Sequence, residues 1–126
     1  MSQDPELPIF EMLGEAKIAA IVAEFYRRVP TDPILGPMYP KDDLAGAEQR
    51  LRSFLIYRFG GPPTYLAERG HPRLRMRHNP FVIDLAARDR WLELMMASIR
   101  EQDLPQTVVD YLERFLGDIA TFLRNH

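Results

Sequence analysis

The sequence predicts an all-α fold with four substantial helices and short helices between them. Apolar residues recur every three or four positions in four long stretches, Gly- and Pro-rich segments separate these stretches, and no segment alternates convincingly between polar and apolar residues. A chain of 126 residues has the length of one domain with a sizeable core. We therefore expect residues 1–126 to form a single domain, with residues 1–12 as an N-terminal extension.

Composition excludes several classes of protein. The chain has 46% hydrophobic and 27% charged residues, which is typical of a soluble globular protein, and its apolar runs are too short to span a membrane. The acidic start, residues 2–8, does not resemble a signal peptide, so we expect a cytoplasmic protein. The absence of cysteine excludes disulfides, thiol nucleophiles and Cys-based metal sites. A formal charge of −2 argues against nucleic acid as a partner.

The first helix is expected at 15–29, after Gly14 and before Pro30. Its apolar residues form one stripe and comprise Ile18, Ile21, Val22, Phe25 and Val29. Tyr26 lies at the inner edge of this stripe. A tyrosine in that position is most often a half-buried core residue with a satisfied hydroxyl. A Gly- and Pro-rich segment at 34–40 follows, and it holds Tyr39 in an extended corner, where an aromatic ring commonly covers the core.

The second long helix is expected at 44–59, with Asp42 and Asp43 as its start signal. Its apolar face comprises Leu44, Ala47, Leu51, Phe54 and Leu55. The small side chain of Ala47 leaves room on this face for something other than a side chain. Arg50 can extend from the edge of such a pocket to water. Two glycines and two prolines at 60–63 end the helix.

Two further long helices complete the expected fold. One runs over 84–102 with Asp84 as its cap, and its buried side comprises Leu85, Trp91, Leu92, Met95 and Ile99. Trp91 is the only tryptophan, and most lone tryptophans are core anchors. The last helix begins around 103–105 and keeps the helical period almost to the C-terminus through Val108, Tyr111, Leu112, Phe115, Ile119, Phe122 and Leu123.

A stretch at 69–81 holds two of the three histidines and four arginines. Pro72 can begin a short helix and Pro80 must end it, which places His78 at the end of about two helical turns. A histidine on a short, braced helix beside apolar neighbours is suited to be an axial ligand of a large flat cofactor. His71 gives no recognised zinc spacing, so we take it as structural. A nucleic-acid patch is the rival interpretation of the arginines, and the acidic total argues against it.

Four stretches together closely resemble the group II truncated haemoglobins. They are Arg-Gly-His-Pro-Arg-Leu-Arg-Met-Arg-His at 69–78, Gly-Gly-Pro-Pro-Thr-Tyr at 60–65, Asp-Leu-Ala-Gly-Ala-Glu at 43–48, and Phe25-Tyr26. The resemblance covers about residues 14–122. It implies a two-over-two α-helical sandwich, a shortened globin fold that encloses a b-type haem. One departure is Leu13-Gly14, where the family usually shows two glycines.

The resemblance also implies roles for individual residues. His78 matches the proximal histidine that bonds the haem iron. The distal side would hold Tyr26, Tyr39, Trp91, Ala47 (where other globins carry histidine or glutamine) and Leu51, with Phe54 and Leu55 lining it. Arg50 matches the residue that pairs with a haem propionate, and Arg75 and Arg77 are further candidates for that role. We also expect Tyr65 and Phe81 to contact the haem.

The residue types are suited to haem chemistry independently of the family resemblance. Ferrous haem needs a neutral imidazole on one face and an open position on the other. Tyr26, Tyr39 and Trp91 can donate hydrogen bonds to bound O2, worth about 0.5–1.5 kcal/mol each. Two bonds of about 1.4 kcal/mol would slow O2 release on the order of a hundredfold. Such a pocket suits retention or reaction of O2 better than delivery.

Three classes of function therefore remain. The first is a globin that binds O2, CO and NO, as a monomer or homodimer. The second is a haem enzyme, either an NO dioxygenase that depends on an external reductase or a peroxidase. The third is a haem-free helical interaction module, which would show no Soret band after reconstitution with hemin.

Overall fold

A computed structural model describes residues 8–63, 65, 67, 70, 73, 76, 78 and 82–126. These residues include four long α-helices and two short 3-10 helices, and none of the described residues forms a strand. In chain order the elements are α1 (Ile9–Arg28), η1 (Val29–Thr31), η2 (Gly36–Met38), α2 (Leu44–Arg58), α5 (Leu85–Arg100) and α6 (Gln106–Leu123). The all-α prediction is confirmed.

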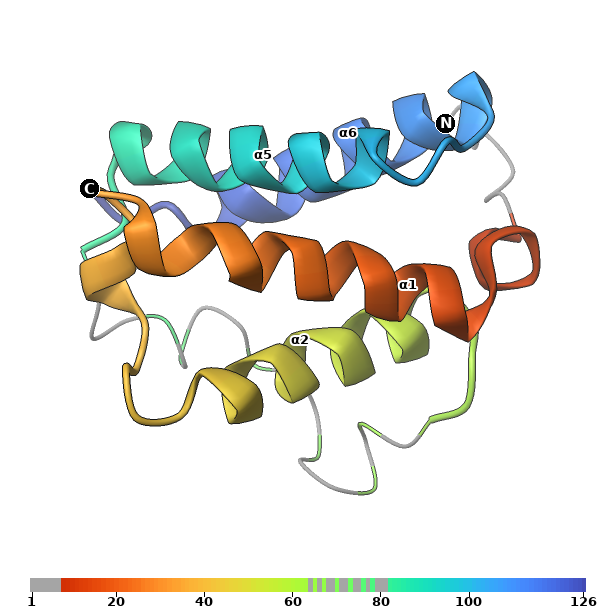
Figure 1. The fold of residues 1–126 in the computed structure, drawn as a ribbon, viewed down its shortest axis with the longest axis horizontal. Coiled ribbons are helices and arrows are strands. Elements are labelled where there is room, and N and C mark those ends of the chain that lie inside the picture. The colour runs from red at the N-terminus through yellow and green to blue at the C-terminus, as the bar shows by residue number, and fades with distance from the viewer. Residues whose placement is uncertain are drawn as a thin grey trace.

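The four long helices form two antiparallel pairs. In Figure 1, α1 and α2 run in opposite directions in one layer, and α5 and α6 do the same in the other. Helix α1 packs against both α2 and α5, and α5 packs against α6. The core between them contains the fully buried side chains Ile18, Val22, Phe25, Met95, Ile99, Val108 and Leu112. This is the two-over-two helical sandwich that the sequence predicts.

Helix α1 begins earlier than the sequence predicts. The expected start was residue 15, because glycine disfavours helix interiors. In the structure the helix already begins at Ile9 and bends at Gly14, whose φ of 78° and ψ of 161° are not helical. The first turn is retained because Ile9 is only 1% exposed. The Phe10 amide also donates to the Phe59 carbonyl oxygen at 3.2 Å, which ties this turn to the end of α2.

The two predicted aspartate caps differ in the structure. Asp84 caps α5 as expected, since its Oδ1 accepts the Ala87 amide at 2.9 Å. Asp43 occupies the N-cap position of α2 without a side-chain cap bond, and its Oδ2 lies 3.3 Å from Nη1 of Arg50 instead. The prediction that Leu85 is buried is wrong, because it is 50% exposed. It precedes the buried Ala87 by two positions, which turns it about 200° away around the helix.

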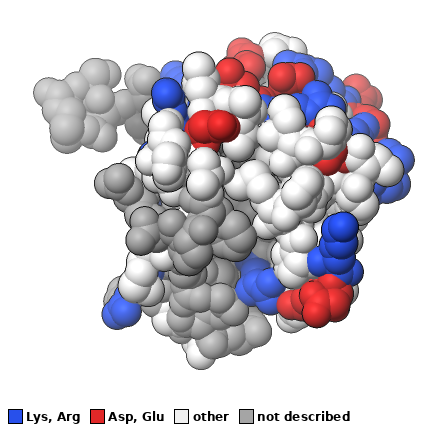
Figure 2. All heavy atoms as spheres, turned by 90° about the vertical axis from the view of Figure 1, so that its left-hand side faces the viewer, with Lys and Arg blue, Asp and Glu red and all other residues white. Residues whose placement is uncertain are grey.

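The surface mixes both signs of charge. Figure 2 shows Lys and Arg side chains beside Asp and Glu side chains on the described part of the face that it presents. Much of this mixing comes from ion pairs within or between neighbouring helices, such as Arg27 with Glu24 and Arg88 with Asp89. Among the described residues, no helix combines the length and apolar character needed to cross a membrane.

Candidate functional site

Three of the predicted site residues meet around one buried phenylalanine. The Phe25 ring centroid lies 5.2 Å from that of Tyr26, 5.9 Å from Trp91 and 6.3 Å from Tyr39. Tyr26 and Tyr39 also contact each other edge to face, with centroids 5.6 Å apart. Tyr26 comes from α1, Trp91 from α5 and Tyr39 from the residue after η2. We call these four residues the aromatic cluster.

Phe25 is the residue that sequence reasoning underrated. The sequence places it in the apolar stripe of the first helix and in the Phe25-Tyr26 pair of the family resemblance, without a role at the site, yet its side chain is 0% exposed and contacts the other three rings of the cluster. Edge-to-face aromatic pairs are favourable beyond the area they bury. Phe25 therefore fixes how the two phenols and the indole lie relative to one another. Its adjacency to Tyr26 was the available signal.

Hydrogen bonding orders the polar ends of the cluster. The Trp91 indole lies close enough to the Tyr39 hydroxyl to lower its pKa through hydrogen bonding. An indole has one donor, whereas a hydroxyl that accepts a hydrogen bond still has its own proton to donate. The single N–H of Trp91 can therefore serve Tyr39, while the hydroxyls of Tyr39 and Tyr26 each keep a proton.

Burial keeps both phenols in their protonated form. It raises the pKa of Tyr39 well above the usual value, and the hydrogen bond from Trp91 offsets only part of this effect. Burial likewise raises the pKa of Tyr26, with a further contribution from Tyr39, while the positive charge of Arg50 acts in the opposite direction. At physiological pH the cluster therefore presents two neutral hydroxyl donors in a largely apolar setting.

Helix α2 carries four further residues of the predicted site. Ala47 and Phe54 are buried, and Leu51 is half-buried against the core. Arg50 is 39% exposed at its side chain and pairs with Asp43. Its positive charge acts to lower the pKa of Tyr26. The prediction that Arg50 meets a haem propionate stays a prediction.

Tyr65 packs against the far end of the same helix. Its ring stacks on Tyr57 at 6.2 Å with an interplanar angle of 13°, and meets Phe54 edge to face at 5.6 Å. Tyr65 is only 4% exposed. The chain just after Pro63 is therefore anchored to α2 by aromatic contacts.

His78 belongs to the stretch for which only some residues are described. Met76 and His78 have helical backbone, as the sequence predicts, and the His78 side chain is half-buried. Arg73 is not helical and has a φ of 48°, so the prediction that the short helix begins at Pro72 is wrong. The prolines at the predicted helix boundaries, the structural histidine and three predicted haem contacts lie outside the described residues; these are Pro72, Pro80, His71, Arg75, Arg77 and Phe81. Sequence reasoning is the only basis for those assignments.

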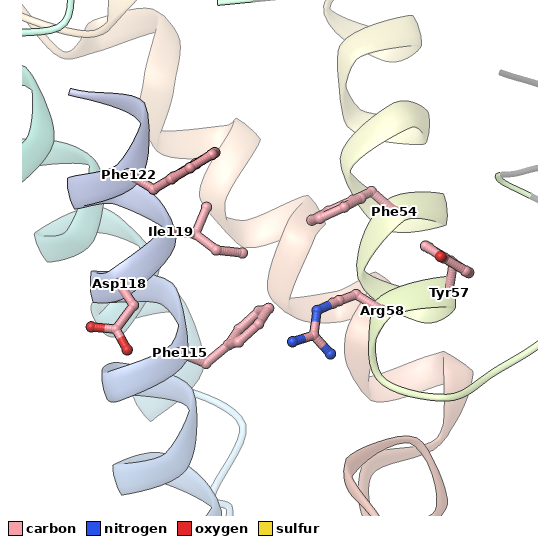
Figure 3. A pocket seen from close by; sticks show the side chains of 7 residues that line it. All are labelled: Phe54, Tyr57, Arg58, Phe115, Asp118, Ile119 and Phe122. Atoms are coloured by element: carbon pink, nitrogen blue, oxygen red, sulfur yellow. The ribbon is translucent and has the colours of Figure 1, made fainter. Parts of the chain in front are cut away.

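A cavity of about 450 Å³ lies between α2 and α6. Figure 3 shows Phe115, Ile119 and Phe122 pointing from α6 toward α2, with Phe54 and Arg58 pointing back. Tyr57 and Asp118 complete the described lining, and the Arg58 guanidinium lies 4.9 Å from the Phe115 ring centroid. The volume of the cavity falls in the range of about 300–1,000 Å³ that is usual for cofactor and ligand sites.

The cavity and the predicted site overlap at one residue. Phe54 lines the cavity, whereas His78 and the aromatic cluster are not among its lining residues. The helical period had placed Phe115, Ile119 and Phe122 on one face of the last helix, and we interpreted that face as core. Phe122 is 54% exposed because it faces this open cavity. Periodicity shows which residues share a face, but not whether a neighbour fills the space before it.

In the ranges that the structure describes, no three His, Cys, Asp or Glu side chains gather closely enough to hold a metal ion. The predicted site offers one candidate histidine and two protonated phenols. One imidazole is the usual protein contribution when a macrocycle supplies the other metal ligands, and this donor set fits such a group.

Comparison with known proteins gives consistent matches. A sequence profile described as bacterial-like globin matches residues 8–124. Group 2 truncated hemoglobin YjbI of Bacillus subtilis (strain 168) is 37% identical over 103 residues, which span 82% of this chain and 77% of the relative.

Solved structures of haemoglobins also resemble this chain. The hemoglobin of the thermophilic phototrophic bacterium Chloroflexus aurantiacus superposes with a TM-score of 0.90 at 43% identity, covering 96% of this chain and 100% of that one. The truncated oxygen-avid haemoglobin of Bacillus subtilis superposes with a TM-score of 0.88 at 35% identity, covering 93% of this chain and 98% of that one.

Proposed function

Because the chain belongs to the bacterial-like globins, and within them to the group II truncated haemoglobins, we propose that it binds O2 and other diatomic gases at a haem b held by His78. Membership of the family implies haem-based gas binding. The observation that carries the finer proposal is the aromatic cluster, in which two protonated phenols and an indole meet around Phe25. Such a set of neutral donors is suited to hold a small polar ligand.

The residues present fit a haem. Phe54 is shared by the predicted site and the cavity between α2 and α6, whose apolar walls also include Phe115 and Ile119. Such walls, continuous with the predicted site at Phe54, suit the edge of a large apolar macrocycle. Arg50 is partly exposed and its charge acts on Tyr26, which supports pairing with a carboxylate at the edge of that macrocycle. The 126 residues contain no cysteine, so thioether attachment is not available and the group would be held non-covalently, as haem b is.

His78 and the phenols have different tasks in this proposal. When bound, a haem iron supplies the position at which a diatomic gas is taken up, and it needs one protein ligand. A ring nitrogen of His78 would be that ligand, which requires the neutral imidazole. The hydroxyls of Tyr39 and Tyr26 would donate to the gas. Each neutral hydrogen bond contributes about 0.5–1.5 kcal/mol, and more in a dry pocket.

Slow release of O2 follows from these donors. Two hydroxyl protons are available once the indole is committed to Tyr39, and two good bonds slow dissociation on the order of a hundredfold. The oxygen-avid relative from Bacillus subtilis supports this direction. Trp91 would contribute by fixing Tyr39 rather than by touching the gas.

The test is a titration of the haem-free protein with hemin, followed by reduction and mixing with CO and O2. We expect one haem per chain, a Soret band, and reversible binding of both gases. Tyr39→Phe should speed O2 dissociation, whereas the matched control Tyr111→Phe, on α6 and stacked on Phe115, should not. Absence of a Soret band, or an O2 dissociation rate that is the same in Tyr39→Phe and in the wild type, would overturn the proposal.

A further inference from the structure

A single buried carboxylate joins the segment after α1 to helix α5. The Asp32 side chain is 1% exposed. Its Oδ2 accepts the backbone amides of Ile34 at 3.1 Å and Leu35 at 2.8 Å, and its Oδ1 accepts Nε of Arg90 at 2.5 Å. One oxygen therefore holds the turn and the other holds the helix.

Asp32 is held in its charged form. Burial alone would raise the pKa of this carboxyl, but the hydrogen bonds from Leu35, Arg90 and Ile34 outweigh burial and lower its pKa below the ordinary value. A buried ion is tolerated when it is paired and hydrogen-bonded, as here. On its other side the Arg90 guanidinium contacts Glu93, with Nη1 and Oε2 3.1 Å apart, and this second contact holds the guanidinium on α5.

Arg90 and Trp91 are neighbours on α5, and they contact the two ends of one short segment. Arg90 bonds to Asp32 at the start of that segment, and Trp91 meets Tyr39 at its end, where both rings pack on Phe25. Between these ends, Gly36 lies so close to η1 that a Cβ there would be 3.2 Å from the Val29 carbonyl oxygen. The segment from 32 to 39 is thus tied down at its beginning, middle and end.

From these contacts at both ends of the segment, we infer that Asp32 and Arg90 form a latch that positions the Tyr39 hydroxyl for ligand binding. The role of the hydroxyl rests on the proposed function, whereas the latch itself rests on the contacts just described. Arg90 and Asp32 are positioning residues, since they act on the ligand only through Tyr39. Opening the latch would release one end of the segment and loosen the hydrogen bond between Trp91 and Tyr39.

The test compares Arg90→Gln with a matched control on the same helix. Arg88 also projects from α5, but it donates to Thr121 Oγ1 at 3.1 Å and to the Gly117 carbonyl oxygen at 3.3 Å, both on α6. Arg88→Gln therefore removes an arginine link of similar kind without touching the segment from 32 to 39. Arg90→Lys keeps the charge without the Nε donor and provides a second variant should Arg90→Gln fail to fold.

Two readouts separate a positioning role from a general loss of stability. Trp91 is the only tryptophan, so its indole N–H gives one resonance in a nitrogen-edited NMR spectrum. We expect Arg90→Gln to shift this resonance and to speed O2 dissociation about fivefold, the factor that corresponds to about 1 kcal/mol. Arg90→Lys should do both to a lesser degree. Arg88→Gln should leave both readouts unchanged.

The decisive experiment introduces Arg90→Gln into the Tyr39→Phe variant and measures O2 dissociation again. With the hydroxyl gone, Arg90→Gln should cause no further change in the O2 dissociation rate. A further change there, or an indole resonance that is the same in Arg90→Gln and in the wild type, would overturn the latch. The resonance is recorded on the ferrous CO complex, or on the haem-free chain should hemin binding fail, so that failure of the proposed function and failure of the latch can be told apart.

Discussion

The rings of Trp91 and Tyr39 both pack on Phe25, with centroids 5.9 Å and 6.3 Å from its own. Hydrogen bonding by the indole lowers the pKa of the Tyr39 hydroxyl, although burial outweighs this effect. The arrangement joins α5 to the segment that leads into α2. We expect the two side chains to act in series, because the indole N–H would order the phenol while the phenol keeps its own proton.

Trp91→Phe tests this serial arrangement. Phenylalanine keeps an aromatic ring beside Phe25 but has no donor, so Tyr39 loses its partner and becomes free to rotate. We expect O2 dissociation to speed up by up to about tenfold, the factor for about 1.4 kcal/mol. Stopped-flow displacement of O2 by CO measures the rate. In a Tyr39→Phe background the same substitution should add almost nothing, and additive effects would show that the indole acts on the ligand by itself.

Removing the ring at the centre of the cluster should cost stability. Phe25 is completely buried, and Phe→Ala substitutions in cores lower the free energy of unfolding by about 3–5 kcal/mol. Chemical denaturation of the Phe25→Ala protein measures this loss. Leu85→Ala serves as the control, since that side chain is 50% exposed and surface changes stay within about 0.5 kcal/mol. A similar loss in both variants would contradict the central packing role of Phe25.

The two cluster phenols should resist alkaline titration. Burial raises the pKa of both Tyr26 and Tyr39 above the usual value of about 10. Their stability contribution is complete below that pH and is lost as the pH rises beyond it toward the folded-state pKa. The difference in tyrosinate absorbance between the wild type and a Tyr26→Phe, Tyr39→Phe variant should therefore stay flat through about pH 10. A step there would mean that water reaches these phenols.

The two aspartates that precede helices should differ in their effect on stability. Asp84 makes the cap bond to Ala87, so Asp84→Ala should lower the free energy of unfolding by about 0.5–2 kcal/mol. Asp43 occupies the equivalent position of α2 without such a bond and forms only a largely exposed ion pair with Arg50. Asp43→Ala should thus cost less. Thermal unfolding of both variants measures the two losses of stability. A larger loss in Asp43→Ala than in Asp84→Ala would contradict this prediction.

Helical periodicity explains why much of the fold could be predicted. The expected helices at 44–59 and 84–102 match α2 and α5 within two residues at each end. The sequence predicts too late a start for the first helix, because glycine disfavours helix interiors, whereas Gly14 only bends a helix that Ile9 holds in the core. Local propensity could not show this, since the burial of Ile9 is a tertiary effect.

The candidate site, too, could be predicted only in part from the sequence. Tyr26, Tyr39 and Trp91 could be named from sequence because the family resemblance marks them, and the structure brings them together. The latch could not be found, because Asp32 and Arg90 lie far apart in the sequence and each looks like an ordinary turn or surface residue. Only the fold reveals that Asp32 is buried and that Arg90 is its partner.

The central claim is that the imidazole of His78 holds the haem iron, and the absorption spectrum of the ferrous protein tests it most directly. Wild-type protein and a His71→Ala control should give the same five-coordinate ferrous spectrum. His78→Ala should lose that spectrum, and added imidazole should restore it by taking the vacated position. A His78→Ala protein whose ferrous spectrum matches the wild type would contradict the account.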